Sequence, residues 1–475
     1  MTTADPLPWE NASLWSRSLP GGSSTPAVIG ARRYDAVVIG GGLTGLLTAV
    51  VLQRAGVDVI VLERHDSIGG VTTRGSTGKL TALQGSMLST ITQLCDAGAA
   101  AQYAQACLFG VGAMRNLIDD LGIDCSLTRA DDHTFATEPE ADTKCAELLQ
   151  HATAAGLPVR WVDATELPFP ILGAVQLADQ AHLDPGALCA GLAGVLGERV
   201  VTGCVVTGVD ESTGGVEVSL ADGRRLTADH VITATLGPVY DPALLTTRCE
   251  ATRSYAIASP HTAPPQGMYI SLDESSRSIR PATIEGAPAV VVAGKGHVVG
   301  KPGDESPDER LDELDRYAQG SLGAQPAMHR WAAHDLVPSD SVPFIGRSAP
   351  GKQRSWVATG FGKWGISTAM VTADLILGEM EGRRRQHADV FEPGRLADNL
   401  TKKLVRDAAR SLQHTVIDRV EELLPGRERH PTCTHMGCRL RFDDREQTWD
   451  CPCHGSRFDA AGQVVCGPAV ADLDL

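Results

Sequence analysis

The chain has 475 residues, of which 43% are hydrophobic and 21% are charged, so it is long enough for two or three domains with buried cores. Its formal net charge of −16 argues against nucleic acid or an anionic membrane as the main partner, because both bind positive surfaces. No stretch predicts a membrane span, and residues 1–30 lack the apolar segment of a secretory signal.

The first 30 residues are polar, with Pro, Gly and Ser, and predict an N-terminal arm that is disordered or loosely docked. Residues 34–39 then predict a buried parallel strand, and residues 40–45 (GGGLTG) form a glycine-rich turn. A helix is expected from Leu43 to about Arg54, followed by a second strand over residues 58–62 that closes on an acid. This order of elements predicts a site for a dinucleotide.

Each residue type in this motif has a physical role. Gly40 permits the tight turn, Gly42 lets the backbone approach a pyrophosphate, and Gly45 lets the helix pack against the strand. The pyrophosphate would meet the positive end of the helix and its free N–H groups, where Leu43 and Thr44 begin the first turn. Glu63 would accept hydrogen bonds from the adenosine ribose hydroxyls and would disfavour a 2′-phosphate.

Further segments carry a family resemblance. Arg64 and Gly69-Gly70 follow the acid, and near the end of the domain stand residues 340–346 (DSVPFIG) and 356–365 (WVATGFGKWG). This pattern resembles the FAD-containing oxidoreductases of the D-amino-acid oxidase type, in which the last segment folds back so that its glycines lie beside the isoalloxazine ring. The resemblance covers most of residues 34–393.

The resemblance implies a mixed α/β (α+β) domain over residues 31–393. Its Rossmann-like FAD-binding parts would lie near 31–95, 195–240 and 335–380, interleaved with a mixed-sheet substrate part. Further FAD contacts are implied for Arg64, Gly70, Thr72, Arg74, Val205, Thr235, Gly346, Gly360, Gly362 and Gly365.

Three candidate catalytic residues are Lys79, Lys363 and His297. Lys79 ends a polar, glycine-punctuated stretch that predicts a loop near the flavin, and a loop lysine in water is its alternative. For His297 a structural role is the favoured interpretation. In this class of flavoproteins the flavin accepts the hydride and side chains mostly orient the substrate.

A second glycine pattern leaves an alternative nucleotide open. Residues 360–365 (GFGKWG) also match G-x-G-x-x-G, as in an NAD site. No strand ending in an acid follows them, which disfavours a second nucleotide domain. We therefore expect electrons to enter from an organic substrate rather than from NADH.

Apolar residues recur on one helical face from Leu396 to Leu423, and Pro425-Gly426 ends the pattern. Residues 394–425 therefore predict a helical connector laid on the flavin domain. Seven of the twelve cysteines precede it without paired spacing, as reduced thiols of a cytoplasmic protein do, whereas five lie between Cys433 and Cys466.

The clustered cysteines form two short motifs, C-x-H at residues 433–435 and C-x-x-H at residues 451–454. The pair resembles the Rieske signature, which implies a 2Fe–2S cluster with one iron held by Cys433 and Cys451 and the other by His435 and His454. The resemblance also implies a disulfide between Cys438 and Cys453. A zinc ion bound by two Cys and two His is the alternative.

This C-terminal unit, residues 426–475, is expected to be small, all-β and abbreviated. Only residues 427–432 separate the connector from the first ligand loop, so the strands that normally support the loops are missing there. We therefore expect the flavin domain or a second subunit to cover the cluster.

Together these features predict a FAD-dependent oxidoreductase that oxidises a small organic substrate and passes electrons singly through the cluster to an external acceptor. The resemblance favours an amine or amino acid. Two alternatives remain: a flavin dehydrogenase or desaturase acting on C–C or C–O bonds, and a non-enzymatic electron-transfer or redox-sensing protein. The expected location is cytoplasmic, and a homo-oligomer is possible.

Overall fold

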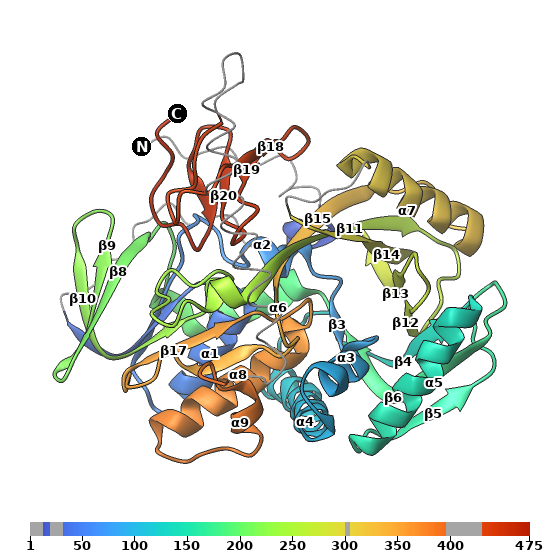
Figure 1. The fold of residues 1–475 in the computed structure, drawn as a ribbon, viewed down its shortest axis with the longest axis horizontal. Coiled ribbons are helices and arrows are strands. Elements are labelled where there is room, and N and C mark those ends of the chain that lie inside the picture. Colours follow the sequence, from blue (N-terminus) through green and yellow to red (C-terminus); the bar gives the residue numbers. More distant parts are fainter. Residues whose placement is uncertain (1–12, 20–31, 300–304, 396–429) are drawn as a thin grey trace.

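A computed structural model describes residues 13–19, 32–299, 305–395 and 430–475 of the chain. Two large sheets with flanking helices form the body of the molecule, and a small C-terminal sheet stands against them (Figure 1). Most of the predicted helical connector, residues 394–425, lies outside the described residues. None of the described helices is long and apolar enough to cross a membrane.

The first large sheet has the order β16-β17-β10-β1-β2-β7, and β9 and β8 continue from β10. β1 pairs in parallel with both β2 and β10, and its residues 36–39 are all buried. A strand covered on both faces needs such a continuous apolar run. The strands are β1 (Arg33–Ile39), β2 (Val59–Leu62), β7 (Val200–Val201), β8 (Val206–Ser212), β9 (Gly215–Leu220), β10 (Arg225–Thr233), β16 (Phe344–Arg347) and β17 (Ser355–Thr359).

Helices pack on one face of this sheet in a shared apolar core. α1 (Leu43–Arg54) has the predicted bounds and contacts α8 (Gly365–Met380) and α6 (Pro185–Leu196). The parallel order β10-β1-β2 with α1 between β1 and β2 is the Rossmann-like arrangement that the sequence predicts.

The second large sheet is mixed and has the order β15-β11-β14-β13-β12-β4-β6-β3, with β5 paired to β6. α7 (Pro307–Leu322) contacts β11 and β14, and α5 (Pro139–Ala154) contacts β4 and β6. α3 (Met87–Leu94) and the long α4 (Ala97–Leu121) connect this layer to α8. The strands are β3 (Lys79–Leu80), β4 (Thr128–Ala136), β5 (Val159–Val162), β6 (Gly173–His182), β11 (Cys249–Pro260), β12 (Met268–Ser271), β13 (Arg277–Ile284), β14 (Ala287–Val298) and β15 (His329–Pro338).

The small C-terminal sheet contains four strands in the order β18-β19-β20-β21. It completes a mixed α/β molecule with a small all-β unit, which confirms the predicted fold class. Its strands are β18 (Arg441–Asp443), β19 (Thr448–Asp450), β20 (Arg457–Asp459) and β21 (Val464–Cys466).

Three local expectations need correction. The part of the N-terminal arm that the structure describes is docked, because Trp15 is buried and its indole donates to Ser76 O at 2.6 Å. Residues 201–209 form a strand-like run in the sequence, which predicts one strand, but the structure has β7 and β8 there because Gly203 turns the chain with φ +66°. Part of the polar stretch after Gly70 is the short helix α2 (Val71–Gly75) rather than a loop.

Short helical turns complete the described chain: η1 (Leu14–Ser18), η2 (Gly197–Arg199), η3 (Leu245–Arg248) and α9 (Ala388–Phe391).

Candidate active site

A cavity of about 820 Å³ opens where the carboxyl ends of β1 and β10 face the second sheet. Its lining includes the glycine-rich turn, α2, the ends of β11 and β14, and the segment before α8. The position follows the rule that open α/β sheets bind ligands beyond the carboxyl ends of their strands.

The glycine-rich turn shows why each glycine is needed. Gly40 has φ +111°, and a Cβ there or on Gly45 would overlap backbone atoms of Ala234 or Gly40, respectively. A Cβ on Gly42 would instead point into open space, with Thr73 Oγ1 at 3.6 Å as its nearest neighbour. The protein therefore leaves room at Gly42, beside the N-terminus of α1, as a bound pyrophosphate requires.

Glu63 follows β2 and is buried at the rim of this space. Its two carboxylate oxygens accept the backbone N–H groups of Gly41 at 2.6 Å and His65 at 2.9 Å. These bonds fix the carboxylate next to the glycine turn, where the adenosine ribose of a dinucleotide lies. The residues present thus fit a bound FAD.

Most predicted cofactor and catalytic residues line the cavity, while others lie behind it. Those in the lining are Gly40, Gly42, Leu43, Thr44, Glu63, Arg64, Gly70, Thr72, Thr235, Gly365, Lys79, His297 and Lys363.

Six of the predicted residues are outside the lining: Gly45, Arg74, Val205, Gly346, Gly360 and Gly362. Arg74 is buried and donates to Ser67 Oγ. Cys204 and Val206 take the lining position expected for Val205. A Cβ on Gly346 would meet Pro393, away from the cavity, so its role in this structure is packing.

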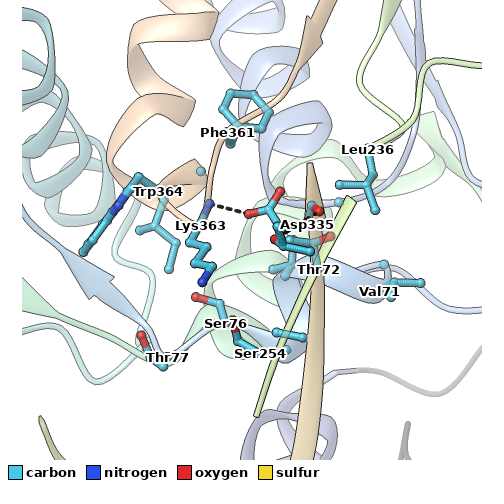
Figure 2. Close-up of a pocket in the computed structure, with 18 of the residues that line it drawn as sticks. Val71, Thr72, Ser76, Thr77, Leu236, Ser254, Asp335, Phe361, Lys363 and Trp364 are labelled. Atoms are coloured by element: carbon cyan, nitrogen blue, oxygen red, sulfur yellow. Dashed lines mark hydrogen bonds between the residues drawn. The ribbon is translucent and has the colours of Figure 1, made fainter. Parts of the chain in front are cut away.

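Lys363 projects into the cavity from the turn between β17 and α8 (Figure 2). Its backbone has φ +76°, a rare conformation for a residue with a side chain, and its N–H donates to Asp335 Oδ2. Lys363 is exposed where it lines the cavity, and desolvation by the surrounding protein lowers the pKa of its ammonium. The turn therefore holds Lys363 in a strained backbone conformation that directs its ammonium into the cavity.

Ser254 lies close to the end of the Lys363 side chain, and His297 follows Gly296 in the same cavity lining. A Cβ added to Gly296 would be 3.1 Å from Ser254 Oγ and 3.2 Å from Lys363 Nζ, so both atoms border the same point. Ser254 Oγ and His297 Nδ1 are shielded from solvent and have no hydrogen-bond partner among the described residues. Unpaired polar atoms at a cavity are expected where a polar ligand binds.

His297 is a neutral imidazole at this position. Burial, together with the nearby Arg310, lowers the pKa of His297 to about 4. A neutral ring can accept a proton or a hydrogen bond from a ligand.

Other cations that line the cavity are tied to protein partners. Arg277 and Lys295 both pair with Glu313, and Arg310 pairs with Glu305. Lys79 is buried rather than placed in a solvated loop, and its ammonium donates to Tyr269 O at 2.7 Å. Among the cations of the described cavity lining, Lys363 is the one whose ammonium has no protein partner in contact.

The two C-terminal motifs bring four candidate ligands together. The thiols of Cys433 and Cys451 are buried and hydrogen-bond to each other, which lowers the pKa of Cys433 to about 7 and raises that of Cys451. The rings of His435 and His454 lie edge to face, with centroids 5.2 Å apart. Their Nδ1 atoms are both buried and unpartnered within the described residues.

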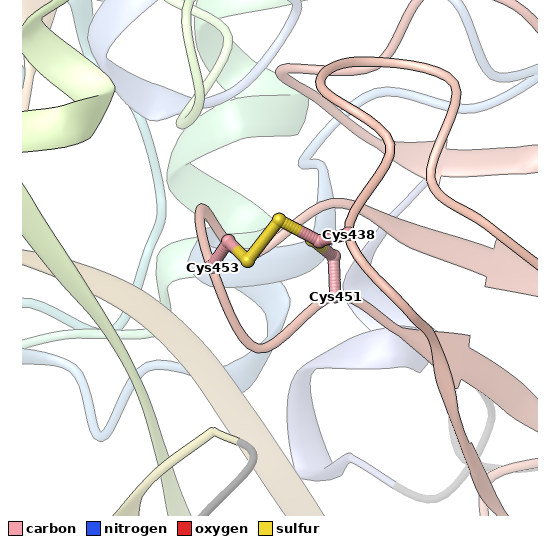
Figure 3. A group of neighbouring side chains, drawn as sticks. All are labelled: Cys438, Cys451 and Cys453. Atoms are coloured by element: carbon pink, nitrogen blue, oxygen red, sulfur yellow. A yellow bond between two sulfur atoms is a disulfide. The ribbon is translucent and has the colours of Figure 1, made fainter. Parts of the chain in front are cut away.

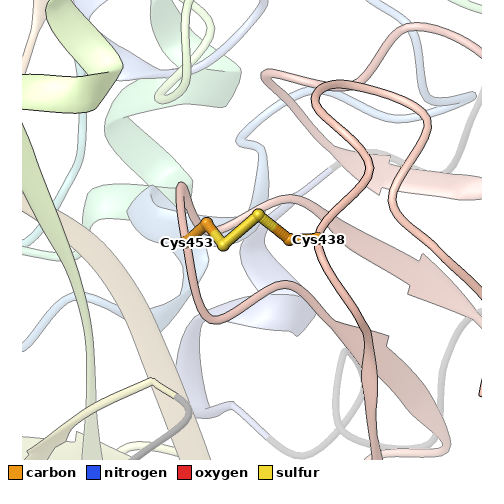
Figure 4. Close-up of a disulfide and its surroundings, with 2 residues drawn as sticks. All are labelled: Cys438 and Cys453. Carbon is orange, nitrogen blue, oxygen red and sulfur yellow. A yellow bond between two sulfur atoms is a disulfide. The ribbon is translucent and has the colours of Figure 1, made fainter. Parts of the chain in front are cut away.

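These donors fit a mixed thiolate and imidazole cluster. Burial lowers the pKa of His435 and lowers that of His454 to about 4, which favours the neutral form that metal ligation requires. The other two cysteines of the ligand loops, Cys438 and Cys453, form a disulfide between the loops (Figure 4). Cys451 lies beside that disulfide, and the three sulfur atoms fall within 4.8 Å of one another (Figure 3).

The C-terminal unit is docked directly on the cavity. Arg64 Nη1 donates to Val464 O at 2.9 Å and His65 Nε2 contacts Val465 O at 2.9 Å. Residues 465–467 of the unit belong to the cavity lining. The flavin domain thus supplies the support that the abbreviated unit lacks, as expected.

Comparison with known proteins agrees with this geometry. Residues 35–378 match the family described as FAD dependent oxidoreductase (DAO), which is more than half of the chain. The chain belongs to this family. Residues 429–474 match the Rieske 2Fe-2S domain, so the cofactors are FAD and a Rieske 2Fe–2S cluster.

One relative matches nearly the whole length of this FAD dependent oxidoreductase, and others match its larger part. YhfW of Bacillus subtilis, whose name describes a Rieske 2Fe-2S iron-sulfur protein, is 27% identical and covers 95% of this chain and 94% of its own length. A glycine oxidase of Bacillus licheniformis is 28% identical over 73% of this chain and 94% of its own. The solved glycine oxidase of Geobacillus kaustophilus has the same fold, with a TM-score of 0.62 at 16% identity over 77% of this chain and 99% of that one.

The Rieske unit has its own relatives. The iron-sulfur subunit of the cytochrome b6-f complex of Synechococcus elongatus is 51% identical over 43 residues, which is 9% of this chain and 24% of that subunit. The Rieske match favours a 2Fe–2S cluster over a zinc ion at the four ligands. The match to the FAD dependent oxidoreductase family disfavours an NAD site at residues 360–365.

Several site residues are absent from the sequence predictions. Ser254, Asp335 and His334 lie in β11 and β15, which contain no motif. Both strands mix polar and apolar residues, and that pattern does not say what each polar residue faces.

Proposed function

We propose that this FAD dependent oxidoreductase oxidises a small amine or amino acid that carries a carboxylate, and that the electrons leave singly through the Rieske cluster to an external acceptor. The observation that carries the proposal is Lys363, a cation in the cavity without a contacting protein counter-ion. Bound FAD supplies the hydride acceptor and the cluster a one-electron carrier.

The side chains around Lys363 have complementary tasks. The Lys363 ammonium would bind the substrate carboxylate, and Ser254 Oγ would donate a hydrogen bond to it. Neutral His297 would accept a hydrogen bond or a proton from the substrate amine. Asp335 would hold the Lys363 backbone in its strained conformation and thereby keep the ammonium aimed at the substrate.

The names of related proteins support a nitrogen-bearing substrate. A glycine oxidase, an L-proline dehydrogenase and an L-amino acid deaminase share this fold at TM-scores of 0.61 to 0.62. All of these names refer to amino acids, whose carboxylate would match Lys363. For this chain the substrate class is our inference from the cavity.

The test is a screen followed by one substitution. Amino acids and their amides are mixed anaerobically with the purified holoenzyme, and flavin bleaching is followed. We expect at least one amino acid to bleach the flavin faster than its amide. Lys363→Met should raise the Kd of that amino acid about 10- to 100-fold, the effect of losing one hydrogen bond to a charged group, and leave the amide unchanged.

Lys352→Met is the matched control, because Lys352 lies over the Tyr240 ring outside the cavity lining. If Lys363→Met weakened the binding of the amino acid and of its amide equally, Lys363 would not be the group that binds the substrate carboxylate. Bleaching by alcohols or saturated C–C substrates but by none of the amines would overturn the proposed substrate class.

A further inference from the structure

Strand β15 lies between the cavity and the loop of the Rieske unit that carries His454. In β15, Ala333 and Asp335 line the cavity, and His334 between them projects to the opposite face. His334 is only 1% exposed, because the Rieske unit covers it. The strand thus touches the flavin site on one face and the cluster unit on the other.

His334 makes a direct bond to a cluster loop. Its Nε2 lies 3.0 Å from Gly455 O. Burial, with Arg457 and Arg253 nearby, lowers the pKa of His334 to about 3, so the ring is neutral and carries one proton. Because a carbonyl oxygen only accepts, that proton is on Nε2 and His334 is the donor.

The loop approaches β15 unusually closely at this point. Gly455 has φ +78°, and a Cβ there would be 2.8 Å from Ala251 Cβ and 3.0 Å from His334 Nε2. Only glycine allows this approach. Gly455 is joined by one peptide bond to His454, a cluster ligand.

The cavity side of β15 is held by a second bond. Thr72 lines the cavity, and its hydroxyl donates to His334 O at 2.8 Å. A continuous chain of bonds therefore leads from Thr72 through His334 and Gly455 to His454.

We propose that His334 is a positioning residue that couples the flavin cavity to the cluster, with the electron route running along this chain of bonds. The inference rests on the proposed function. An electron leaves the reduced flavin and reduces the oxidised cluster, while His334 keeps its proton and no covalent bond changes.

The test measures electron transfer directly and needs no substrate. The flavin of the holoenzyme is reduced by a laser flash with an external photoreductant, and cluster reduction is followed by absorbance. His334→Leu removes the donor at similar volume, and His334→Gln keeps an N–H at similar reach. Flavin content, the cluster EPR spectrum and both reduction potentials are measured for each variant.

We expect His334→Leu to slow transfer about 10- to 100-fold, the range found when a hydrogen-bond partner behind a metal ligand is removed, with EPR spectrum and potentials retained. His334→Gln should restore most of the rate. His261→Leu is the matched control, since His261 Nε2 bonds Leu322 O at 2.7 Å far from the cluster loop.

A wild-type rate in His334→Leu with an intact cluster would overturn the proposal. Loss of the cluster from both His334 variants would also overturn it, because the residue would then act on folding alone. Absence of flavin-to-cluster transfer in the unsubstituted enzyme would instead refute the proposed function.

Discussion

At the residue scale, Lys79 illustrates how burial sets the charge of a side chain at the cavity. Lys79 and Asp132 are both buried, and Asp132 accepts from Thr81 Oγ1 at 2.8 Å. Burial lowers the pKa of Lys79 to about 8, and Asp132 opposes that change while Arg280 adds to it. Burial likewise raises the pKa of Asp132 to about 6, so the two groups ionise over neighbouring pH ranges.

The lowered pKa predicts a specific pH dependence of stability. Between about pH 8 and 10.5 the unfolded chain holds a proton on Lys79 that the folded protein has released. Linkage then makes the folded state more stable as pH rises through this window. Denaturant midpoints should rise for the wild type relative to Lys79→Met from about pH 7 to about pH 10.

Lys144→Met on the exposed face of α5 serves as the control and should show no such trend. A wild-type-to-Lys79→Met difference that stays constant over the same pH range would show that Lys79 is not desolvated.

At the element scale, the β1-α1-β2 unit places the cofactor. Gly42→Ala adds a methyl group to the open space before α1 without overlapping any protein atom. The protein should therefore fold normally but bind FAD about tenfold more weakly or worse, because the methyl group occupies the place of the pyrophosphate. Flavin fluorescence titration of the apoprotein measures this loss.

Gly112→Ala in α4 is the control, since a Cβ there meets nothing within 4 Å and alanine favours the helix. Unchanged FAD affinity in Gly42→Ala would show that the pyrophosphate does not bind at this turn.

The same elements show what the sequence could predict. The bounds of α1 and the strands on either side follow from apolar periodicity and glycine, which act within a few residues. The Rieske ligands could also be predicted, because each Cys and His pair lies within a few residues of sequence. By contrast, α2 replaces part of an expected loop because its polar residues make distant contacts, such as Thr72 with His334. A local pattern contains no information about such partners.

At the scale of the whole molecule, a buried charged cluster joins the two units. Arg253 in β11 is 3% exposed and bonds Asp443 and Asp450 of the Rieske unit, both at 2.7 Å. Glu446 lies 3.2 Å from the same guanidinium. Moving Arg253 away from these carboxylates would leave buried charges without partners, which is unfavourable. These contacts therefore favour one orientation of the unit. Their separation of up to 197 residues explains why no local motif predicted them.

Because the Rieske unit docks on the flavin domain, residues of both units form the cavity. Residues 465–467 line the cavity, and the loop carrying His454 rests on β15. The Rieske unit is therefore one wall of the flavin site as well as a carrier of the cluster. In β15, Ala333 and Asp335 line the cavity, while His334 contacts the loop that carries His454.

The most direct test of the account is an anaerobic single turnover followed by EPR and absorbance. The oxidised holoenzyme is mixed with one equivalent of an amino acid that bleaches its flavin. The proposed electron route predicts that the Rieske EPR signal appears as the flavin gives up one of its two electrons, because the cluster accepts a single electron. A flavin that stays reduced beside an oxidised cluster would contradict it.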